Sequence, residues 1–329
     1  MRDLQKSNRR ISNMRDSGPQ ASDDTELIAR VAYYYYVEGL TQNRVAEKFG
    51  ISRIRVNRMI AHARAVGLVK VRIASSLNLK VEADLERKFG IEKAVLVPTP
   101  ENIQNLHEAI AAAAGLQLSN RLQDGLSIGV GWGRTLRMSV GFADKRKLAG
   151  VSIVSLLGGL TRGSVMNTYE TASRLADLYD ADCFYIAAPA FADDEETAQV
   201  LRDQSSVRDV FARARQIDLA LLSVGALNTQ STMSRLGLIS TQDVHSLNAA
   251  GAVGDLCAQW IDAHGNIVDH PLNRRVVAFS VNELGNIPCV ILASGGKEKV
   301  AAIRAALRRK IVSVLVTDET TAQDLLAEA

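Results

Sequence analysis

The stretch 40–67, LTQNRVAEKFGISRIRVNRMIAHARAVG, has the spacing of two short helices joined by a tight turn. Gln42 and Ala46 lie four residues apart and share one face of the first helix. Gly50 follows at the position of a left-handed C-terminal cap, where glycine meets no steric penalty. Ser52 can accept a hydrogen bond from the backbone of the second helix, which is typical of an N-cap. The stretch therefore predicts a helix-turn-helix unit.

The second helix of this unit is expected to have one buried face and one exposed face. Its apolar residues recur at helical spacing and should face the core, namely Val56, Met59, Ile60 and Ala63. The opposite face carries Arg53, Arg55, Asn57 and Arg58. Arginine pairs bidentately with guanine and asparagine with adenine, and other guanidinium groups hold phosphates. We predict that these four residues contact DNA, together with Gln42 and Ser52. The alternative is a solvated basic helix in an unrelated helical domain.

The charge of the chain is divided unevenly. The 329 residues are 47% hydrophobic and carry a formal charge of +3, which allows about two domains with a substantial core. The first 72 residues hold 14 Lys/Arg against 7 Asp/Glu, a charge of +7, and the remainder hold 25 against 29, a charge of −4. A small basic module joined to a mildly acidic larger one suits a protein whose head meets nucleic acid.

The cysteines and the apolar runs indicate neither a metal centre nor a membrane protein. Cys183, Cys257 and Cys289 are widely separated, so neither a disulfide framework nor a zinc site is expected. No apolar run reaches the length of about 20 residues that spans a bilayer, and the N-terminus lacks the apolar segment of a signal peptide. We expect a cytoplasmic protein without membrane contact.

Three regions follow from the pattern along the chain. Residues 1–24 are polar and indicate a flexible tail. Residues 25–73 contain a first helix that packs on the two described above, and end in a run from 68 to 73 that is either a wing strand or an exit segment. Residues 74–329 form a larger effector-binding and oligomerisation domain, which begins with a short connector and a charged helix.

The large domain is predicted as an α/β fold with a mainly parallel, Rossmann-like sheet. Apolar, β-rich runs alternate with helical stretches, and four of these runs are apolar enough to be buried on both faces. The predicted strands are 93–97, 126–130, 151–157, 183–187, 217–224, 274–281, 288–293 and 312–317. The predicted helices include 101–122, 166–179 and 299–309.

Ligands of such sheets bind at the carboxyl ends of the strands, where three loops are rich in glycine. In the first loop, free N–H groups at Gly133 and the Thr135 hydroxyl could hold a phosphate; the alternative is a tight packing turn. The second loop contains Gly158 and Gly159, followed by residues 161–163. The third contains Gly295, Gly296 and Lys297, and a lysine at a helix start is unfavourable unless an anion lies there. The alternative is a lysine that extends into water.

A fourth stretch, 251–255, places two glycines before Asp255. The Asp255 carboxylate could accept hydrogen bonds from ligand hydroxyls. Alternatively, it caps a following helix.

These motifs together resemble one family, the SorC/DeoR-type sugar-responsive transcriptional regulators of bacteria. The resemblance runs from Thr25 to near the C-terminus and rests on the stretch 40–69, on VGWGRTL, LLGG and GAVGDLC, and on ASGGKEKVAAIRAAL with LVTDETTA. Two positions depart from the family pattern: Ile54 stands where many members have proline, and Asn57 where a small hydroxyl residue is common.

The resemblance implies a DNA-binding head on a domain similar in fold to the glucosamine-phosphate and ribose-phosphate isomerases. It implies a phosphorylated sugar or related metabolite as effector, and a homodimer or homotetramer. By motif position, the effector contacts would be Gly133, Thr135, Asp255 and Lys297, with Gly295 and Gly296 in the last loop.

We therefore predict a ligand-responsive regulator, with repression as the expected direction of control, that binds operator DNA and a sugar, a polyol or one of their phosphates. The alternative is an isomerase- or deaminase-like enzyme with a helical extension. The five histidines are scattered and none stands beside a carboxylate in a glycine loop, so we predict no catalytic residue, cofactor or metal.

Overall fold

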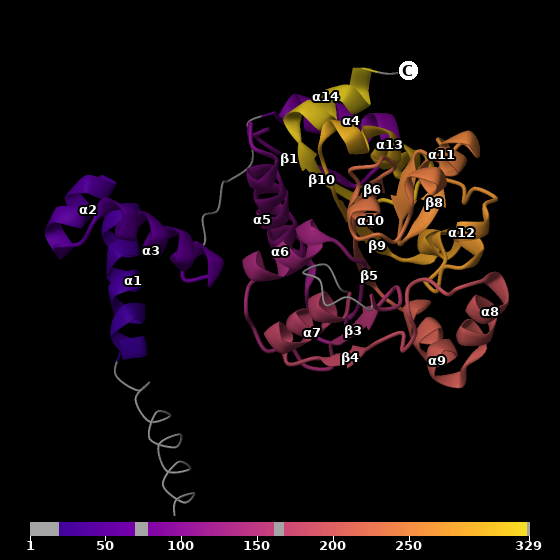
Figure 1. The fold of residues 1–329 in the computed structure, drawn as a ribbon, viewed down its shortest axis with the longest axis horizontal. Coiled ribbons are helices and arrows are strands. Elements are labelled where there is room, and N and C mark those ends of the chain that lie inside the picture. Colours follow the sequence, from indigo (N-terminus) through magenta and orange to yellow (C-terminus); the bar gives the residue numbers. More distant parts are fainter. Residues whose placement is uncertain (1–19, 70–77, 161–167, 328–329) are drawn as a thin grey trace, which may run out of the picture. The chain divides into compact units, whose positions relative to one another are not determined.

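The computed structural model describes residues 20–69, 78–160 and 168–327 (Figure 1). The chain divides into two compact units, Met1–Val71 and Arg72–Ala329, each with its own core. Parts of four predicted segments lie outside the described residues: the tail, the run 68–73 beyond Val69, most of the connector, and the second glycine loop from Thr161 to Asn167.

The N-terminal unit consists of the helices α1 (Gln20–Tyr36), α2 (Gln42–Phe49) and α3 (Arg53–Ala65). Thr41 and Ser52 cap α2 and α3, and the Ser52 hydroxyl accepts from the Arg55 N–H at 3.2 Å. Gly50 ends α2 in the left-handed conformation, with φ +62°. Of the apolar side chains predicted for the core of α3, Val56, Met59 and Ile60 are buried in one cluster with Val31 and Val45, and Ala63 is buried as well. The predicted helix-turn-helix geometry is thus confirmed.

The large unit is built on a parallel sheet of seven strands in the order β1-β10-β9-β5-β2-β3-β4. Both faces of this sheet are buried, because successive residues of β1 alternate between two cores: Ala94 and Leu96 belong to one, Val95 and Val97 to the other. The predicted α/β fold with a mainly parallel sheet is confirmed. The strands are β1 (Lys93–Val97), β2 (Ser127–Val130), β3 (Ser152–Ser155), β4 (Asp182–Phe184), β5 (Leu219–Leu222), β9 (Cys289–Ala293) and β10 (Val314–Asp318).

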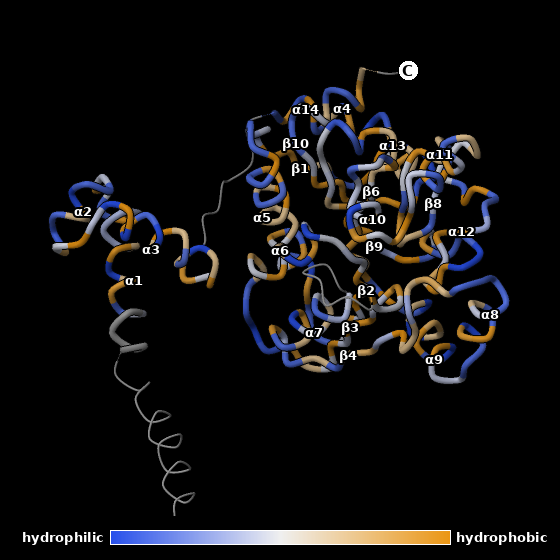
Figure 2. The backbone as a smooth tube through the Cα atoms, viewed as in Figure 1, coloured by the Kyte–Doolittle hydropathy of each residue, from blue (hydrophilic) through white to orange (hydrophobic). Residues whose placement is uncertain are grey.

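Helices cover both faces of the sheet. One face carries α5 (Ile103–Arg121), α6 (Arg134–Phe142) and α7 (Thr168–Tyr179). The other carries α4 (Leu79–Phe89), α9 (Ser205–Ala214), α13 (Val300–Arg308) and α14 (Glu319–Ala327). Figure 2 shows polar and apolar residues alternating along these helices, as expected for helices with one face on a core.

A smaller antiparallel sheet stands beside the carboxyl ends of the main strands. It consists of β6 (Val224–Ala226), β7 (Gly254–Leu256) and β8 (Gln259–Ile261), which pair in that order. A third core, centred on the fully buried Trp260, packs this sheet against short helices. The remaining helices are α8 (Glu195–Asp203), α10 (Thr232–Arg235), α11 (Thr241–Ala249), α12 (Pro271–Arg274), η1 (Val281–Asn286) and η2 (Lys297–Lys299).

Two local predictions are wrong. The run 274–281 is not a strand: it follows α12 and forms only isolated bridges, Val276 with Phe191 and Ala278 with Leu157, before η1 begins. Its residues are apolar because they are buried, but no neighbouring strand runs alongside them. The segment after Asp255 is not a helix but the turn between β7 and β8. Cys257 and Ala258 make this turn with positive φ, which a helix would not allow.

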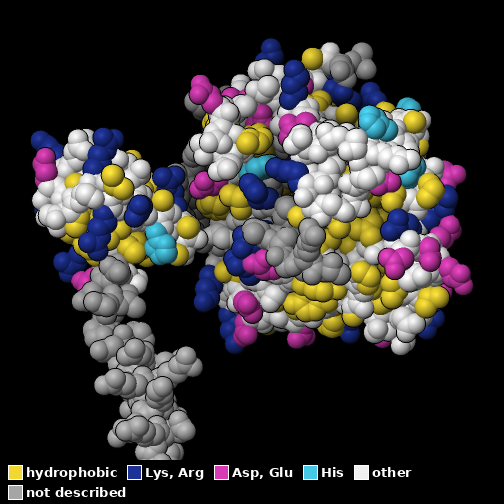
Figure 3. Space-filling view, in the orientation of Figure 1, with side chains coloured by type: hydrophobic (Ala, Val, Ile, Leu, Met, Phe, Trp, Pro, Cys, Tyr) yellow, Lys and Arg dark blue, Asp and Glu magenta, His cyan; other side chains and the backbone are white. Residues whose placement is uncertain are grey.

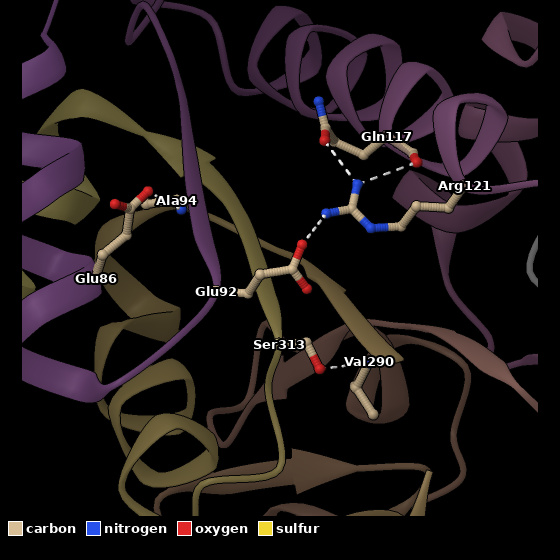
Figure 4. A network of polar contacts seen from close by, with 7 residues as sticks. All are labelled: Glu86, Glu92, Ala94, Gln117, Arg121, Val290 and Ser313. Carbon is tan, nitrogen blue, oxygen red and sulfur yellow. Dashed lines mark hydrogen bonds and ion pairs between the residues drawn. The ribbon is translucent and has the colours of Figure 1, made fainter. Parts of the chain in front are cut away.

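Polar contacts hold the amino ends of the main strands in register (Figure 4). Arg121, at the end of α5, donates to the Gln117 side chain and to Glu92, both at 3.0 Å. The Ser313 hydroxyl accepts from the Val290 N–H at 3.0 Å and so joins the starts of β9 and β10. The amino ends are therefore occupied by structural contacts, which leaves the carboxyl ends for a ligand.

The packing of α5 on α6 depends on Gly115. A Cβ at this position would lie 2.5 Å from the Ser139 carbonyl oxygen and 3.0 Å from the Ala143 nitrogen, both in the backbone. We expect Gly115→Ala to lower the free energy of unfolding by about 1–3 kcal/mol, because α6 must move away. The measurement is denaturant unfolding of the whole chain.

Gly141→Ala is the matched control, since a Cβ added to this α6 glycine would have no atom within 4 Å. Alanine there should leave stability unchanged or raise it by up to about 1 kcal/mol, because alanine is the better helix former. Equal losses in the two variants would contradict the packing role of Gly115.

Candidate functional site

A cleft of about 590 Å³ opens in the large unit at the carboxyl ends of β2 and β5. The two strands are neighbours in the sheet. The next strand of this sheet after β2 in the chain is β3, on one side of the pair, whereas the next after β5 is β9, on the other side. Such a point of diverging connections is where open α/β sheets bind ligands. The lining comes from the start of α5, residues 132–135, much of 223–235, Asp255, Glu298 and Lys299.

The first glycine loop brings the start of α6 to the cleft. Gly133 has φ +126°, a conformation that L side chains rarely adopt, and provides no side-chain cap for the helix. The first N–H groups of α6 therefore lie beside the cleft without a capping side chain, and carry the partial positive charge of a helix N-terminus. Gly133 and Thr135 both line the cleft.

His107, on α5, completes this end of the cleft and was not assigned a role from the sequence. Its Nδ1 lies 3.2 Å from the Thr135 hydroxyl oxygen. Burial, with the neighbouring charges of Lys299 and Arg134, lowers the pKa of His107 to about 4. The imidazole is thus neutral at pH 7 and acts there as a hydrogen-bonding group. Its position depends on the α5–α6 packing, which the spacing of residues in the sequence does not reveal.

Asp255 lies on β7 with its side chain in the cleft wall, 4% exposed. Opposite it on β6 is Gly225, where a Cβ would collide with the Asp255 carboxylate. One oxygen, Oδ2, accepts from the Ala258 N–H at 3.2 Å. Burial raises the pKa of Asp255 to about 7, although that hydrogen bond and Lys299 oppose the shift. The predicted alternative, a helix cap, is wrong because a hairpin follows.

The third glycine loop was predicted to contact the effector, but its residues Gly295, Gly296 and Lys297 do not line the cleft. Gly295 and Gly296 are buried, and the Gly296 N–H donates to Asp318 at 3.2 Å and to the Thr321 hydroxyl at 2.9 Å. Lys297 is exposed and is not among the lining residues. These contacts fasten the loop to the start of α14.

Lys299, two residues further on, lies in the lining of the cleft and can present a cation there. Lys297 and Lys299 lie in the 3₁₀ turn η2, where a step of two residues turns a side chain by about 240°. When one lysine points outward, the other therefore faces a different side. Burial lowers the pKa of the half-buried Lys299, while Glu298 and Asp255 act in the opposite direction.

Further basic and polar groups surround these residues. Arg134 on α6 and Arg235 on α10 are exposed at the cleft, and Asn228, Ser231 and Thr232 offer amide and hydroxyl groups. Figure 3 shows basic side chains and a histidine gathered on the face of the large unit near α5. The arrangement combines an anion-binding end with hydrogen-bonding groups suited to hydroxyls.

In the N-terminal unit, the six residues predicted to contact DNA lie together. Arg53, Arg55, Asn57 and Arg58 are exposed on α3, and Ser52 caps that helix. Gln42, from α2, accepts from Arg53 Nε and donates to Asn57 Oδ1, each at 3.4 Å. Gln42 thus orients two side chains of α3, which is a second role that its position in the sequence did not indicate.

Three further findings concern only the described residues. No group of His, Cys, Asp and Glu there has the arrangement of a metal site. The three cysteines are free thiols. None of the helices in the described ranges is long and apolar enough to cross a membrane.

Residues 74–327 match the family model of a sugar-binding domain. The transcriptional regulator LsrR of Klebsiella pneumoniae is 33% identical over 98% of this chain and 99% of its own. The erythritol catabolism regulatory protein EryD of Brucella abortus is 30% identical over 94% and 98%. The full-length sorbitol operon regulator SorC of Klebsiella pneumoniae has a similar structure, with a TM-score of 0.70, 25% identity and coverage of 92% and 99%.

The buried carboxyl group makes stability depend on pH. An unfolded Asp255 has an ordinary pKa near 4, whereas the folded group titrates at about 7, so the folded state binds the proton more tightly. The stability contributed by this proton is lost as pH rises through 7. We expect the advantage of Asp255→Asn over the wild type in free energy of unfolding to grow by about 2–3 kcal/mol between pH 5 and pH 8, with most of the change below pH 7.

Denaturant unfolding at several pH values measures this difference. Asp209→Asn, on the exposed side of α9, is the control and should show a constant difference from the wild type. A pH-independent effect of Asp255→Asn would contradict the raised pKa.

Proposed function

The chain belongs to the SorC/DeoR-type family of sugar-binding transcriptional regulators, and we propose that a phosphorylated sugar or polyol in the cleft controls its binding to operator DNA. The observation that carries the choice of effector is the pairing, in one cleft, of an uncapped helix N-terminus and Lys299 with the buried Asp255. The first two suit an anion, and the carboxyl group suits hydroxyls.

The phosphate is proposed to bind at the start of α6. Gly133, Thr135 and Lys299 all line the cleft, and the Lys299 charge reaches His107, whose Nδ1 lies 3.2 Å from the Thr135 hydroxyl oxygen. Because burial lowers the pKa of the half-buried Lys299, an anionic ligand beside it would stabilise the charged form that burial disfavours. Charge-assisted hydrogen bonds of this kind are stronger than neutral ones.

The hydroxyl groups of the effector are proposed to bind Asp255 and the amide and hydroxyl side chains of residues 228–232. With a pKa of about 7, the Asp255 carboxyl can accept or donate a hydrogen bond near neutral pH. Relatives named for erythritol catabolism, for deoxyribonucleosides and for the sorbitol operon support a sugar or polyol skeleton.

DNA binding is proposed for the exposed face of α3, with residues 25–73 as the DNA-binding domain and 74–329 as the effector and oligomerisation domain. The division between the two compact units and the family match from residue 74 support these boundaries. A single head makes few base contacts, so we propose a homodimer or homotetramer that holds paired heads over half-sites. Transcription in vitro with and without effector tests the expected repression.

The two lysines of η2 give a matched test of the effector site. We expect Lys299→Gln to weaken binding of a phosphorylated ligand by about 10- to 100-fold, the loss of one charge-assisted hydrogen bond, and Lys297→Gln to leave it within about twofold. The probes are erythritol, deoxyribose and sorbitol, each with and without a phosphate, in thermal shift and calorimetry. Equal losses in the two variants, or steady turnover of the bound probe, would contradict the proposed function.

Arginine substitutions test the DNA-binding face. We expect Arg53→Ala to weaken operator binding by about 1–3 kcal/mol if the side chain reads a base, and to relax the sequence preference at one position of each half-site. Arg30→Ala is the control of equal charge, because Arg30 lies on α1 and pairs there with Glu26. Fluorescence anisotropy with operator DNA measures both. Unchanged affinity of Arg53→Ala would contradict the assignment.

A further inference from the structure

Ile54 is a large apolar side chain that does not belong to the apolar core formed by the described residues of the N-terminal unit. It is the second residue of α3 and is 69% exposed, whereas Val56, Met59 and Ile60 of the same helix are buried. A helix turns about 100° per residue, so Ile54 lies on the side of α3 opposite Val56. The core of the N-terminal unit therefore does not explain an isoleucine at this position.

The neighbours of Ile54 are the polar side chains proposed to meet DNA. Asn57 and Arg58 follow it by three and four residues and lie on the same stripe of the helix, and both are exposed. Arg53 and Arg55 flank it in sequence. Any surface that docks on Asn57 and Arg58 therefore also covers Ile54, and the charge around it favours an anionic partner.

We propose that Ile54 contacts the C5-methyl group of a thymine in the operator and so specifies that base. The inference rests on the proposed function, since it takes the DNA-binding face as given. The N-terminal residues of a recognition helix reach the base edges of the major groove. There the thymine methyl is the apolar group, whereas the other edges are hydrogen-bond donors and acceptors.

This chemistry makes the contact selective. Against a thymine methyl, Ile54 buries apolar surface on both sides, which is favourable. Against any other edge, the same side chain removes water from donors or acceptors without replacing their hydrogen bonds, which is unfavourable. Removal of one buried methyl group is expected to lower the affinity for a half-site roughly fourfold.

The test is thymine-to-uracil scanning, because uracil lacks only the C5-methyl group. An operator is first selected from random duplexes with the full-length wild-type protein, and each thymine of a half-site is then replaced singly by uracil. We expect one position per half-site where uracil weakens wild-type binding about fourfold in fluorescence anisotropy. Ile54→Ala should bind the thymine operator about fourfold less tightly and be insensitive to uracil at that position.

Val37→Ala is the matched control, since Val37 is 68% exposed and lies after α1, outside the recognition helix. It should keep wild-type affinity and wild-type sensitivity to uracil. Thermal unfolding of all variants checks their folding, which substitution of an exposed side chain should leave intact.

The outcomes separate the inference from the function it rests on. If the wild type selects no operator, the proposed function fails. If the wild type binds but no uracil position matters, or if Ile54→Ala retains the wild-type sensitivity, the function stands and the thymine contact is overturned. A change in oligomeric state of Ile54→Ala with sensitivity to uracil retained would assign the side chain to a protein contact instead.

Discussion

The arrangement of the large unit depends on a parallel sheet that is buried on both faces. With both faces covered by helices, a ligand can reach the sheet only at the strand ends. The amino ends are occupied by contacts such as that of Arg121 with Glu92, and the carboxyl ends open where the connections from β2 and β5 diverge. The cleft is therefore a consequence of strand order, and its chemistry is set by the residues that follow β2, β5 and β9, together with His107 on α5 and Asp255 on β7.

Local signals in the sequence were sufficient for the features that depend on neighbouring residues. Gly50 and Ser52 predicted the turn and the start of α3, because caps act within one helical turn. The alternation of apolar, β-rich runs with helical stretches predicted the parallel sheet, because this pattern also depends only on residues that are close in sequence. The glycines of the first loop predicted a turn, and Gly133 takes φ +126° there.

Features that depend on distant residues were not accessible in this way. His107 meets Thr135 only because α5 and α6 approach closely at Gly115, and Asp255 meets Gly225 only through strand pairing. The run 274–281 resembled a strand in sequence because its residues are apolar, but they are apolar because they are buried and not because they pair with a neighbouring strand. Lys297 was predicted to contact the effector, and Lys299 was not, because the sequence does not indicate which residues of a short 3₁₀ turn face the cleft.

A ligand in the cleft can change DNA binding only if it binds more tightly to one conformation of the protein than to the other. The loop before Lys299 makes contacts that could differ between two such conformations. Lys299 belongs to η2, and Gly296 before it is bonded to Asp318 and Thr321. These two residues belong to the junction of β10 and α14. From α14, Glu319 accepts from Asn78, and carbonyl groups near its end accept from Lys88. Asn78 and Lys88 lie at the two ends of α4, the first helix after the N-terminal unit, so hydrogen bonds and the backbone of α14 link the loop before Lys299 to that helix.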